Sequence, residues 1–131
     1  MKIGMDTSVI LRLLVGQPVD QTERAVAILD EMARQGDQGV VSDLVIAEAY
    51  FALQHHSGVS KKDALSGLHR LLEDQEIEAT GVAVAVLNIP GLAFAKPGFV
   101  DRLIHHAYTE TGNSMVTFER AAHKLKSVRV L

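Results

Sequence analysis

Four acidic residues lie beside short apolar segments or on helical segments, and together they could bind a metal ion. They are Asp6, Glu48, Asp101 and Glu119. Clustered carboxylates repel one another unless a divalent cation neutralises them, and all-oxygen ligands select Mg²⁺ or Mn²⁺ rather than zinc. Such an ion can activate water and stabilise the charge that develops when a phosphodiester bond is cleaved. If the four acids converge, the sequence therefore predicts metal-dependent phosphoryl hydrolysis.

Each acid also has an ordinary structural explanation. Asp6 directly follows an apolar segment, where it could be the N-cap of a helix. Asp101 and Glu119 could be first-turn acids that complement a helix dipole. Glu48 could be a solvated helix residue, but its spacing from Leu44 and Phe51 predicts a position on the apolar face of its helix. A carboxylate buried there would have to be protonated, paired or bound to a cation.

The elements that must position these acids alternate along the chain. Five short apolar segments are expected to be strands: Lys2–Met5, Gly39–Val41, Ile77–Ala79, Met115–Thr117 and Val128–Val130. Helices are expected between them, over 9–15, 20–35, 42–56, 60–72, 81–95 with a break at Asn88–Pro90, and 99–111. Strands that alternate with helices predict an α/β fold, a three-layer α/β/α sandwich with a mostly parallel central sheet of about five strands. Functional residues of such sheets lie beyond the carboxyl ends of the strands.

Three of these helices carry predicted start signals. Ser42 and Ser60 are expected to cap the helices that follow them, and Asp20–Glu23 has the spacing of a capping box. The apolar helical surfaces Ala25–Met32 and Leu65–Leu72 could serve the core or a partner. No repeat or linker marks a boundary, so we expect a single domain over residues 1–131.

Composition excludes several other classes of protein. Thirteen Lys and Arg against sixteen Asp and Glu give a net charge of −3, so bulk charge does not predict nucleic-acid binding. The absence of Cys excludes thiol catalysis, thiolate zinc sites and disulfide scaffolds. The longest uncharged segment, Ala79–Ala95, contains Pro and Gly and falls short of a membrane span. An acid at position 6 interrupts any signal peptide, and we therefore expect a cytoplasmic protein without a membrane segment.

Four segments, in this order, resemble a PIN domain, most closely a VapC-type toxin of a bacterial toxin–antitoxin pair. These segments are Met1–Arg12, Ser42–Glu48, Gly98–Ile104 and Met115–Glu119, and the similarity extends over nearly the whole chain. The resemblance implies an endoribonuclease that depends on Mg²⁺ or Mn²⁺ and leaves a 5′-phosphate and a 3′-hydroxyl. It also implies a cognate antitoxin as partner, and we expect a homodimer.

The resemblance also implies a role for each residue. Asp6, Glu48 and Asp101 would bind the metal, and Glu119 would stand at the fourth acidic position of the catalytic set. Thr7 or Ser8 would assist near the metal or the substrate. Relatives usually have Asp at the fourth position, and many have an acid where this chain has Gly98. A site with fewer acids predicts a single metal, or tight metal binding only in the presence of RNA.

Further substrate contacts are expected near the C-terminus. Thr117 and Arg120 flank Glu119 and are candidate substrate-binding residues, and Arg120, His123 and Lys124 share a helical face that suits RNA phosphates. An ordinary solvated helix explains this face equally well. His105, four residues after Asp101, could donate a hydrogen bond to that acid.

Other functions fit the sequence less well. A receiver domain needs an acid pair after its first strand and a Lys after its last strand, and neither is present. An aspartyl phosphatase needs a second Asp two residues after Asp6, where this chain has Ser8. The remaining alternative is a catalytically weak PIN domain that acts as a binding or scaffold module.

Overall fold

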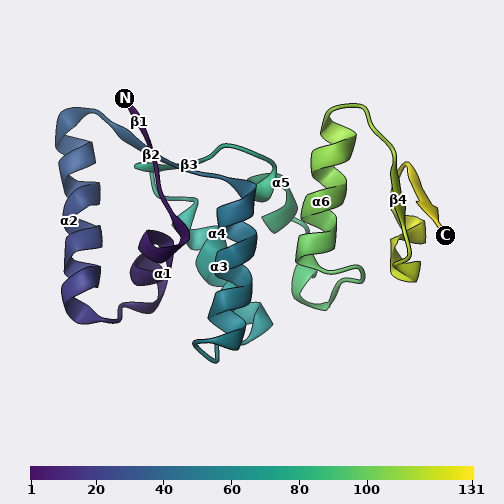
Figure 1. Ribbon diagram of the computed structural model, residues 1–131, viewed down its shortest axis with the longest axis horizontal. Helices are drawn as coiled ribbons and strands as arrows, with labels where there is room; N and C mark the ends of the chain where they lie inside the picture. Colours follow the sequence, from purple (N-terminus) through teal and green to yellow (C-terminus); the bar gives the residue numbers. More distant parts are fainter. The chain divides into compact units, whose positions relative to one another are not determined.

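The computed structural model describes all 131 residues and forms two units, Met1–Thr80 and Gly81–Leu131 (Figure 1). The first unit contains β1 (Lys2–Gly4), α1 (Thr7–Val15), α2 (Val19–Gln35), β2 (Gln38–Val41), α3 (Asp43–His55), α4 (Lys61–Leu71) and β3 (Ile77–Ala79). The second contains α5 (Ala83–Leu87), the 3₁₀ helix η1 (Leu92–Phe94), α6 (Phe99–Glu110), β4 (Met115–Thr117), the 3₁₀ helix η2 (Arg120–Lys124) and β5 (Val128–Val130). The predicted single domain over residues 1–131 stays a prediction.

All five predicted strands are present, and every strand pair is parallel. The first unit has a sheet in the order β1-β2-β3, in which Lys2 is opposite Gln38 and Gly39 is opposite Ile77. The second unit has a sheet of β4 and β5, in which Met115 is opposite Val128. The chain is therefore a mixed α/β protein with parallel strands, as expected. The central sheet of about five strands that the sequence predicts is found as two smaller sheets.

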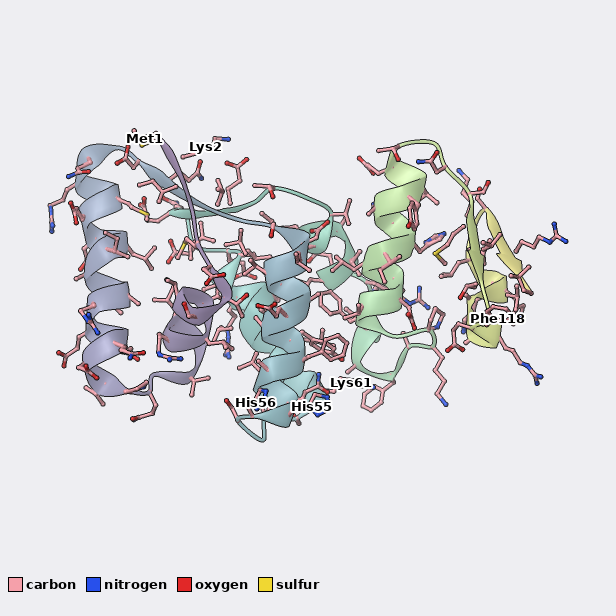
Figure 2. The ribbon with its side chains drawn as sticks, viewed as in Figure 1. Met1, Lys2, His55, His56, Lys61 and Phe118 are labelled. Atoms are coloured by element: carbon pink, nitrogen blue, oxygen red, sulfur yellow. The ribbon has the colours of Figure 1, made fainter.

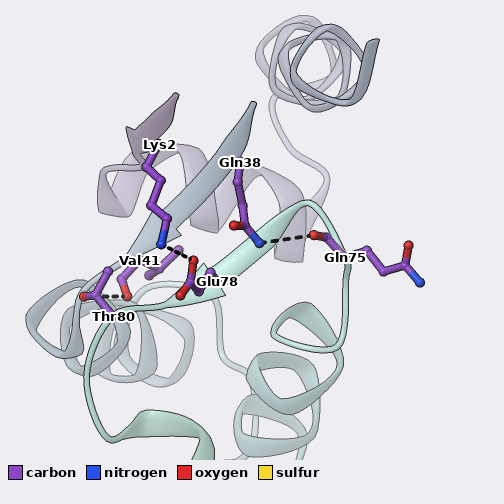
Figure 3. A network of polar contacts seen from close by, with 6 residues as sticks. All are labelled: Lys2, Gln38, Val41, Gln75, Glu78 and Thr80. Carbon is purple, nitrogen blue, oxygen red and sulfur yellow. Dashed lines mark hydrogen bonds and ion pairs between the residues drawn. The ribbon is translucent and has the colours of Figure 1, made fainter. Parts of the chain in front are cut away.

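Side chains connect all three strands of the first sheet (Figure 3). The ammonium group of Lys2 on β1 lies 2.9 Å from the carboxylate of Glu78 on β3, and so reaches across β2. The Thr80 hydroxyl donates to the Val41 carbonyl over 3.4 Å. A Cβ at Gly39 on β2 would lie 2.5 Å from the sulfur of Met5 and 3.2 Å from the carbonyl oxygen of Glu76. A larger residue at position 39 would therefore require the side chain of Met5, the residue before Asp6, to shift.

The core of the first unit forms where its helices meet. Helix α1 packs against α2, α3 and α4, and α3 also packs against α4. Ile10, Ile46 and Leu68, one from each of α1, α3 and α4, have no exposed surface. Burial of a side chain of this size stabilises the fold by roughly 1.5–3 kcal/mol.

The core of the second unit lies along α5 and α6, which pack against each other. Phe99 and Leu103 of α6 are 2% and 4% exposed, and Val86 of α5 is fully buried. The predicted break at Asn88–Pro90 is confirmed, because α5 ends at Leu87 with Asn88 as its C-cap. None of the helices in either unit combines the length and the apolar character needed to cross a bilayer.

Two of the three predicted helix starts are confirmed. The Ser42 hydroxyl accepts from the backbone N–H of Val45 over 3.3 Å, and the Ser60 hydroxyl accepts from that of Asp63 over 3.1 Å. The predicted capping box at Asp20 is wrong, because α2 already begins at Val19 and its N-cap, Pro18, makes no side-chain cap bond. Asp20 lies instead within the first turn, where its charge complements the helix dipole.

Candidate functional site

Asp6 lies in the short connection between β1 and α1. Met5 extends the strand by donating to the Val40 carbonyl over 2.9 Å, and Asp6 is then the N-cap of α1. Its backbone carbonyl accepts from Val9 and Ile10 over 3.1 and 3.2 Å, but its carboxylate makes no cap hydrogen bond. The N-cap explanation therefore fits the backbone of Asp6 and leaves its carboxylate without a partner. The side chain is exposed and free to bind a ligand.

The next residue carries a buried polar group that also lacks a partner. Thr7 is 7% exposed, and its Oγ1 makes no hydrogen bond. Leaving a buried hydroxyl unsatisfied costs about 1–3 kcal/mol, so such groups are rare unless a ligand or water completes them. Ser8 follows on the same helical turn and is exposed. The start of α1 therefore has an exposed carboxylate on Asp6, an exposed hydroxyl on Ser8 and a buried hydroxyl without a partner on Thr7.

Glu48 lies on α3, but not on the face that the sequence predicted. The buried residues of this helix are Ile46, Ala49, Tyr50 and Leu53. Leu44 is 76% exposed and Phe51 46% exposed, and Glu48 is exposed between them. Glu48 is therefore a solvated helix residue, one of the two explanations that the sequence left open, and its position on a buried apolar face is not found. Because α3 is apolar on most sides, periodicity alone could not select the face that packs against α1 and α4.

Asp6 and the start of α3 nevertheless lie at the same edge of the sheet. Asp6 follows β1, and Ser42, the N-cap of α3, follows β2, which is the parallel neighbour of β1. Both residues lie at the carboxyl edge of the sheet, where ligands of α/β proteins bind. Glu48 lies six residues after Ser42, about 9 Å further along the helix axis at 1.5 Å per residue.

In the second unit, Asp101 and Glu119 line the same pocket, which has a volume of about 220 Å³. Asp101 lies in the first turn of α6 and is exposed, without an ion pair or a hydrogen bond. Thr117, at the end of β4, lines the pocket with them. Tyr108 of α6 also lines it, and the sequence interpretation missed this residue. Its spacing of seven residues from Asp101 indicates the same helix face and could have identified it.

Glu119 is held by two hydrogen bonds at the start of η2. Its backbone N–H donates to Oγ1 of Thr117 over 3.0 Å, and its Oε1 accepts from the backbone N–H of Ala121 over 3.1 Å. Phe118, between Thr117 and Glu119, is 81% exposed (Figure 2). The bond to Ala121 shows that Glu119 caps η2, and its other carboxylate oxygen remains available.

The loop that precedes Asp101 is held by the next residue of α6. The guanidinium group of Arg102 donates to the carbonyl of Pro97 over 2.8 Å and to that of Lys96 over 3.5 Å. Pro97 itself lines the pocket with Asp101. Arg102 therefore fixes one wall of this pocket.

The predicted RNA contacts of η2 and the predicted hydrogen bond of His105 have different outcomes. Arg120, His123 and Lys124 are all exposed on η2, and the His123 ring lies 2.8 Å from the Arg120 carbonyl. Their contact with RNA stays a prediction. The ring Nε2 of His105 lies 2.6 Å from the Lys126 carbonyl, with which it forms a hydrogen bond. The predicted bond from His105 to Asp101 is not found, because that ring connects α6 to the segment before β5.

The other histidine pair belongs to the first unit. His55 and His56 end α3, near Lys61 at the start of α4 (Figure 2). The His55 ring stacks on Phe51, with 6.3 Å between ring centroids. This stacking gives His55 a packing role in which it needs no metal.

The structure brings the predicted site residues together in two groups. Asp6, Thr7 and Ser8 share the start of α1, and Asp101, Thr117 and Glu119 share a pocket of the second unit. Within neither unit do three or more His, Cys, Asp or Glu side chains come together as metal ligands. The convergence of all four acids stays a prediction, because each unit holds two of them.

No protein-family model matches this sequence, and no curated protein matches it. The resemblance to PIN domains therefore depends on the four sequence segments.

Proposed function

We propose that this protein is a metal-dependent endoribonuclease, the toxin of a toxin–antitoxin pair, that hydrolyses RNA phosphodiester bonds. One observation carries the proposal. The Asp6 carboxylate forms no cap hydrogen bond, and the neighbouring Thr7 hydroxyl is buried without a partner. Both groups lie just beyond the carboxyl end of a parallel strand, which is where α/β enzymes bind their ligands. A ligand that accepts from Thr7 and binds the Asp6 carboxylate would satisfy both groups.

The available donors suit a hard cation. Asp6, Glu48 and Asp101 offer carboxylate oxygens, and no Cys is present in the chain. Oxygen ligands of this kind select Mg²⁺ or Mn²⁺. When bound, such an ion supplies the positive charge and the activated water that phosphodiester hydrolysis needs. Asp6, Glu48 and Asp101 are therefore the residues that we propose to hold it.

The remaining residues of the site would bind and orient the RNA. The Thr7 and Ser8 hydroxyls can donate to phosphate oxygens, and the Arg120 guanidinium can neutralise phosphate charge. The hydrogen bond from the Glu119 N–H to Thr117 fixes the backbone that carries the fourth carboxylate. In this proposal Thr117 is a positioning residue as well as a candidate substrate contact.

The proposed function requires a particular architecture. It is a three-layer α/β/α sandwich with a mostly parallel central sheet of about five strands. What supports this part of the proposal is that all strand pairs of both units are parallel. The cognate antitoxin, the homodimer and a cytoplasmic location belong to the same proposal.

The test compares RNA cleavage with Mn²⁺, with EDTA, and by the Asp6→Asn variant. We expect Mn²⁺-dependent cleavage that EDTA abolishes and that Asp6→Asn lowers by at least about 100-fold, the effect of losing a few kcal/mol of transition-state stabilisation. Asp30→Asn, which removes an exposed acid from α2, is the matched control and should cleave normally. Metal-independent cleavage, or full activity of Asp6→Asn, would remove the mechanism. RNA binding without any cleavage would instead support the binding-module alternative.

A further inference from the structure

A second, open pocket with a volume of about 360 Å³ is lined by helices α1 and α2. Its polar lining consists of Ser8, Arg12, Gln21 and Arg24, and the other lining residues are Val9, Ala25 and Ile28. Two arginines therefore line a pocket whose lining contains no carboxylate. This distribution of charge favours an anionic ligand.

Arg12 is oriented but carries no ion pair. Its Nε donates to Oε1 of Gln21 over 2.5 Å, and its backbone carbonyl accepts from the Thr22 hydroxyl over 3.3 Å. None of the ion pairs of the protein includes Arg12. The bond to Gln21 fixes the guanidinium group at Nε and leaves its terminal nitrogens unbound. A guanidinium group held in this way is preorganised for an anion.

Arg24 has only a weak partner. It lies 3.9 Å from Asp20, one helical turn away, and the two side chains are 76% and 79% exposed. Exposed pairs of this kind contribute little to stability, so Arg24 can turn towards an anion at small cost. Both arginines are therefore available to the same ligand.

We propose that this pocket binds a phosphate group of the RNA strand next to the bond that is cleaved. The inference depends on the proposed function, because it assigns a binding role to residues beside that site. Ser8 belongs to both the first turn of α1 and the pocket, and Arg12 lies six residues after Asp6, about 9 Å along the helix axis. A polyanion with one phosphate at Asp6 can place a further phosphate beside this helix, at Arg12. The apolar side chains of Ala25 and Ile28 offer a surface for the sugar.

The experiment measures RNA binding apart from cleavage. A short labelled single-stranded RNA of mixed sequence is titrated with protein in EDTA, and its fluorescence anisotropy is followed at several salt concentrations. We expect Arg12→Gln/Arg24→Gln to weaken binding by about 10-fold and to reduce the salt slope by about 0.7 for each phosphate that the variant no longer neutralises. In the presence of Mn²⁺ the same variant should raise KM more than it lowers kcat.

Arg34→Gln is the matched control, because Arg34 is an exposed arginine in the last turn of α2 and does not line the pocket. The single variant Arg24→Gln changes only an exposed side chain and provides a second measurement if the double variant does not fold. The inference is overturned if the pocket variants bind RNA as Arg34→Gln does, or if wild type does not bind RNA. The inference is also overturned if the pocket variants keep their affinity for RNA but no longer bind a polyglutamate peptide. That result would assign the pocket to an acidic protein partner. Failure of the proposed function would appear differently, as the absence of Mn²⁺-dependent cleavage by wild type.

Discussion

The backbone N–H of Glu119 donates to Oγ1 of Thr117 over 3.0 Å, and this bond connects the last residue of β4 to an acid in the same pocket. The Oε1 atom of Glu119 is occupied by the N–H of Ala121. The backbone and one carboxylate oxygen of Glu119 are therefore fixed by its own segment, and the other oxygen is left for a ligand. The sequence predicts Glu119 as a first-turn acid or as a functional residue. The first-turn prediction is wrong, because Glu119 is the N-cap of η2 and caps it with its own side chain, and the functional role stays a prediction.

Thr117→Val tests whether this bond positions Glu119. Valine keeps the shape of threonine but removes the acceptor, so the free energy of unfolding should fall by up to about 1 kcal/mol. If Glu119 takes part in catalysis, kcat for RNA cleavage should fall by about 10-fold while KM changes little. Thr117→Ser keeps the hydroxyl and should restore the activity. Equal activity of the Val and Ser variants would show that the hydroxyl plays no part in positioning Glu119.

Local signals in the sequence predicted much of the fold. Ser42 and Ser60 cap helices because their hydroxyls reach backbone N–H groups three residues ahead, and this geometry depends only on neighbouring residues. The exposed position of Glu48 was not predictable, because α3 is apolar on most sides and its neighbours α1 and α4 determine its buried face. Strand positions were predicted, but strand pairing depends on residues far apart in the chain. The missing partner of Thr7 likewise appears only in three dimensions.

Thr7→Val should separate stability from function. Because the Thr7 hydroxyl is buried without a partner, its replacement by a methyl group should raise the free energy of unfolding of the ligand-free protein by about 1 kcal/mol. If the hydroxyl contacts the substrate, cleavage should fall by about 10-fold in the same variant. Urea denaturation and RNA cleavage measure the two effects, with Thr7→Ser as the control that keeps the hydroxyl. A less stable Val variant would contradict the absence of a partner.

His105→Ala should destabilise the second unit without affecting metal binding. The variant loses the 2.6 Å hydrogen bond to the Lys126 carbonyl, which should cost about 1 kcal/mol in urea denaturation. His106→Ala is the control, because His106 lies 3.5 Å from Glu110 in a surface pair worth at most about 0.5 kcal/mol. The Mn²⁺ concentration for half-maximal cleavage should be unchanged in both variants. A higher Mn²⁺ requirement in His105→Ala alone would point to a contact with Asp101 after all.

The free energy of unfolding should fall at alkaline pH because Tyr50 is buried. Burial raises the pKa of Tyr50, and a side-chain hydrogen bond with Gln54 offsets part of this rise. The unfolded chain therefore loses the phenolic proton first, so stability decreases as the pH rises above about 10, the ordinary tyrosine value. Tyr50→Phe should lack this decrease. The chain has two tyrosines, so the variant Tyr108→Phe leaves Tyr50 as the one that titrates. The midpoint of its absorbance titration should lie above that of free tyrosine. A midpoint at the ordinary value would contradict the effect of burial.

Gly98→Asp should strengthen metal binding at Asp101. Gly98 is the N-cap of α6 with φ −79° and ψ −168°, a conformation open to any residue, and a Cβ there meets no atom within 4 Å. The new carboxylate would lie three residues before Asp101 on the same side of the helix. Under the proposed function, we expect the Mn²⁺ concentration for half-maximal cleavage to fall by about 10-fold, the effect of roughly 1.4 kcal/mol of added attraction. Gly98→Asn provides a cap of the same size without the charge, and its Mn²⁺ requirement should equal that of wild type. If Asn and Asp shift the requirement equally, helix capping rather than the carboxylate is responsible, and Asp101 would lose this support as a metal ligand.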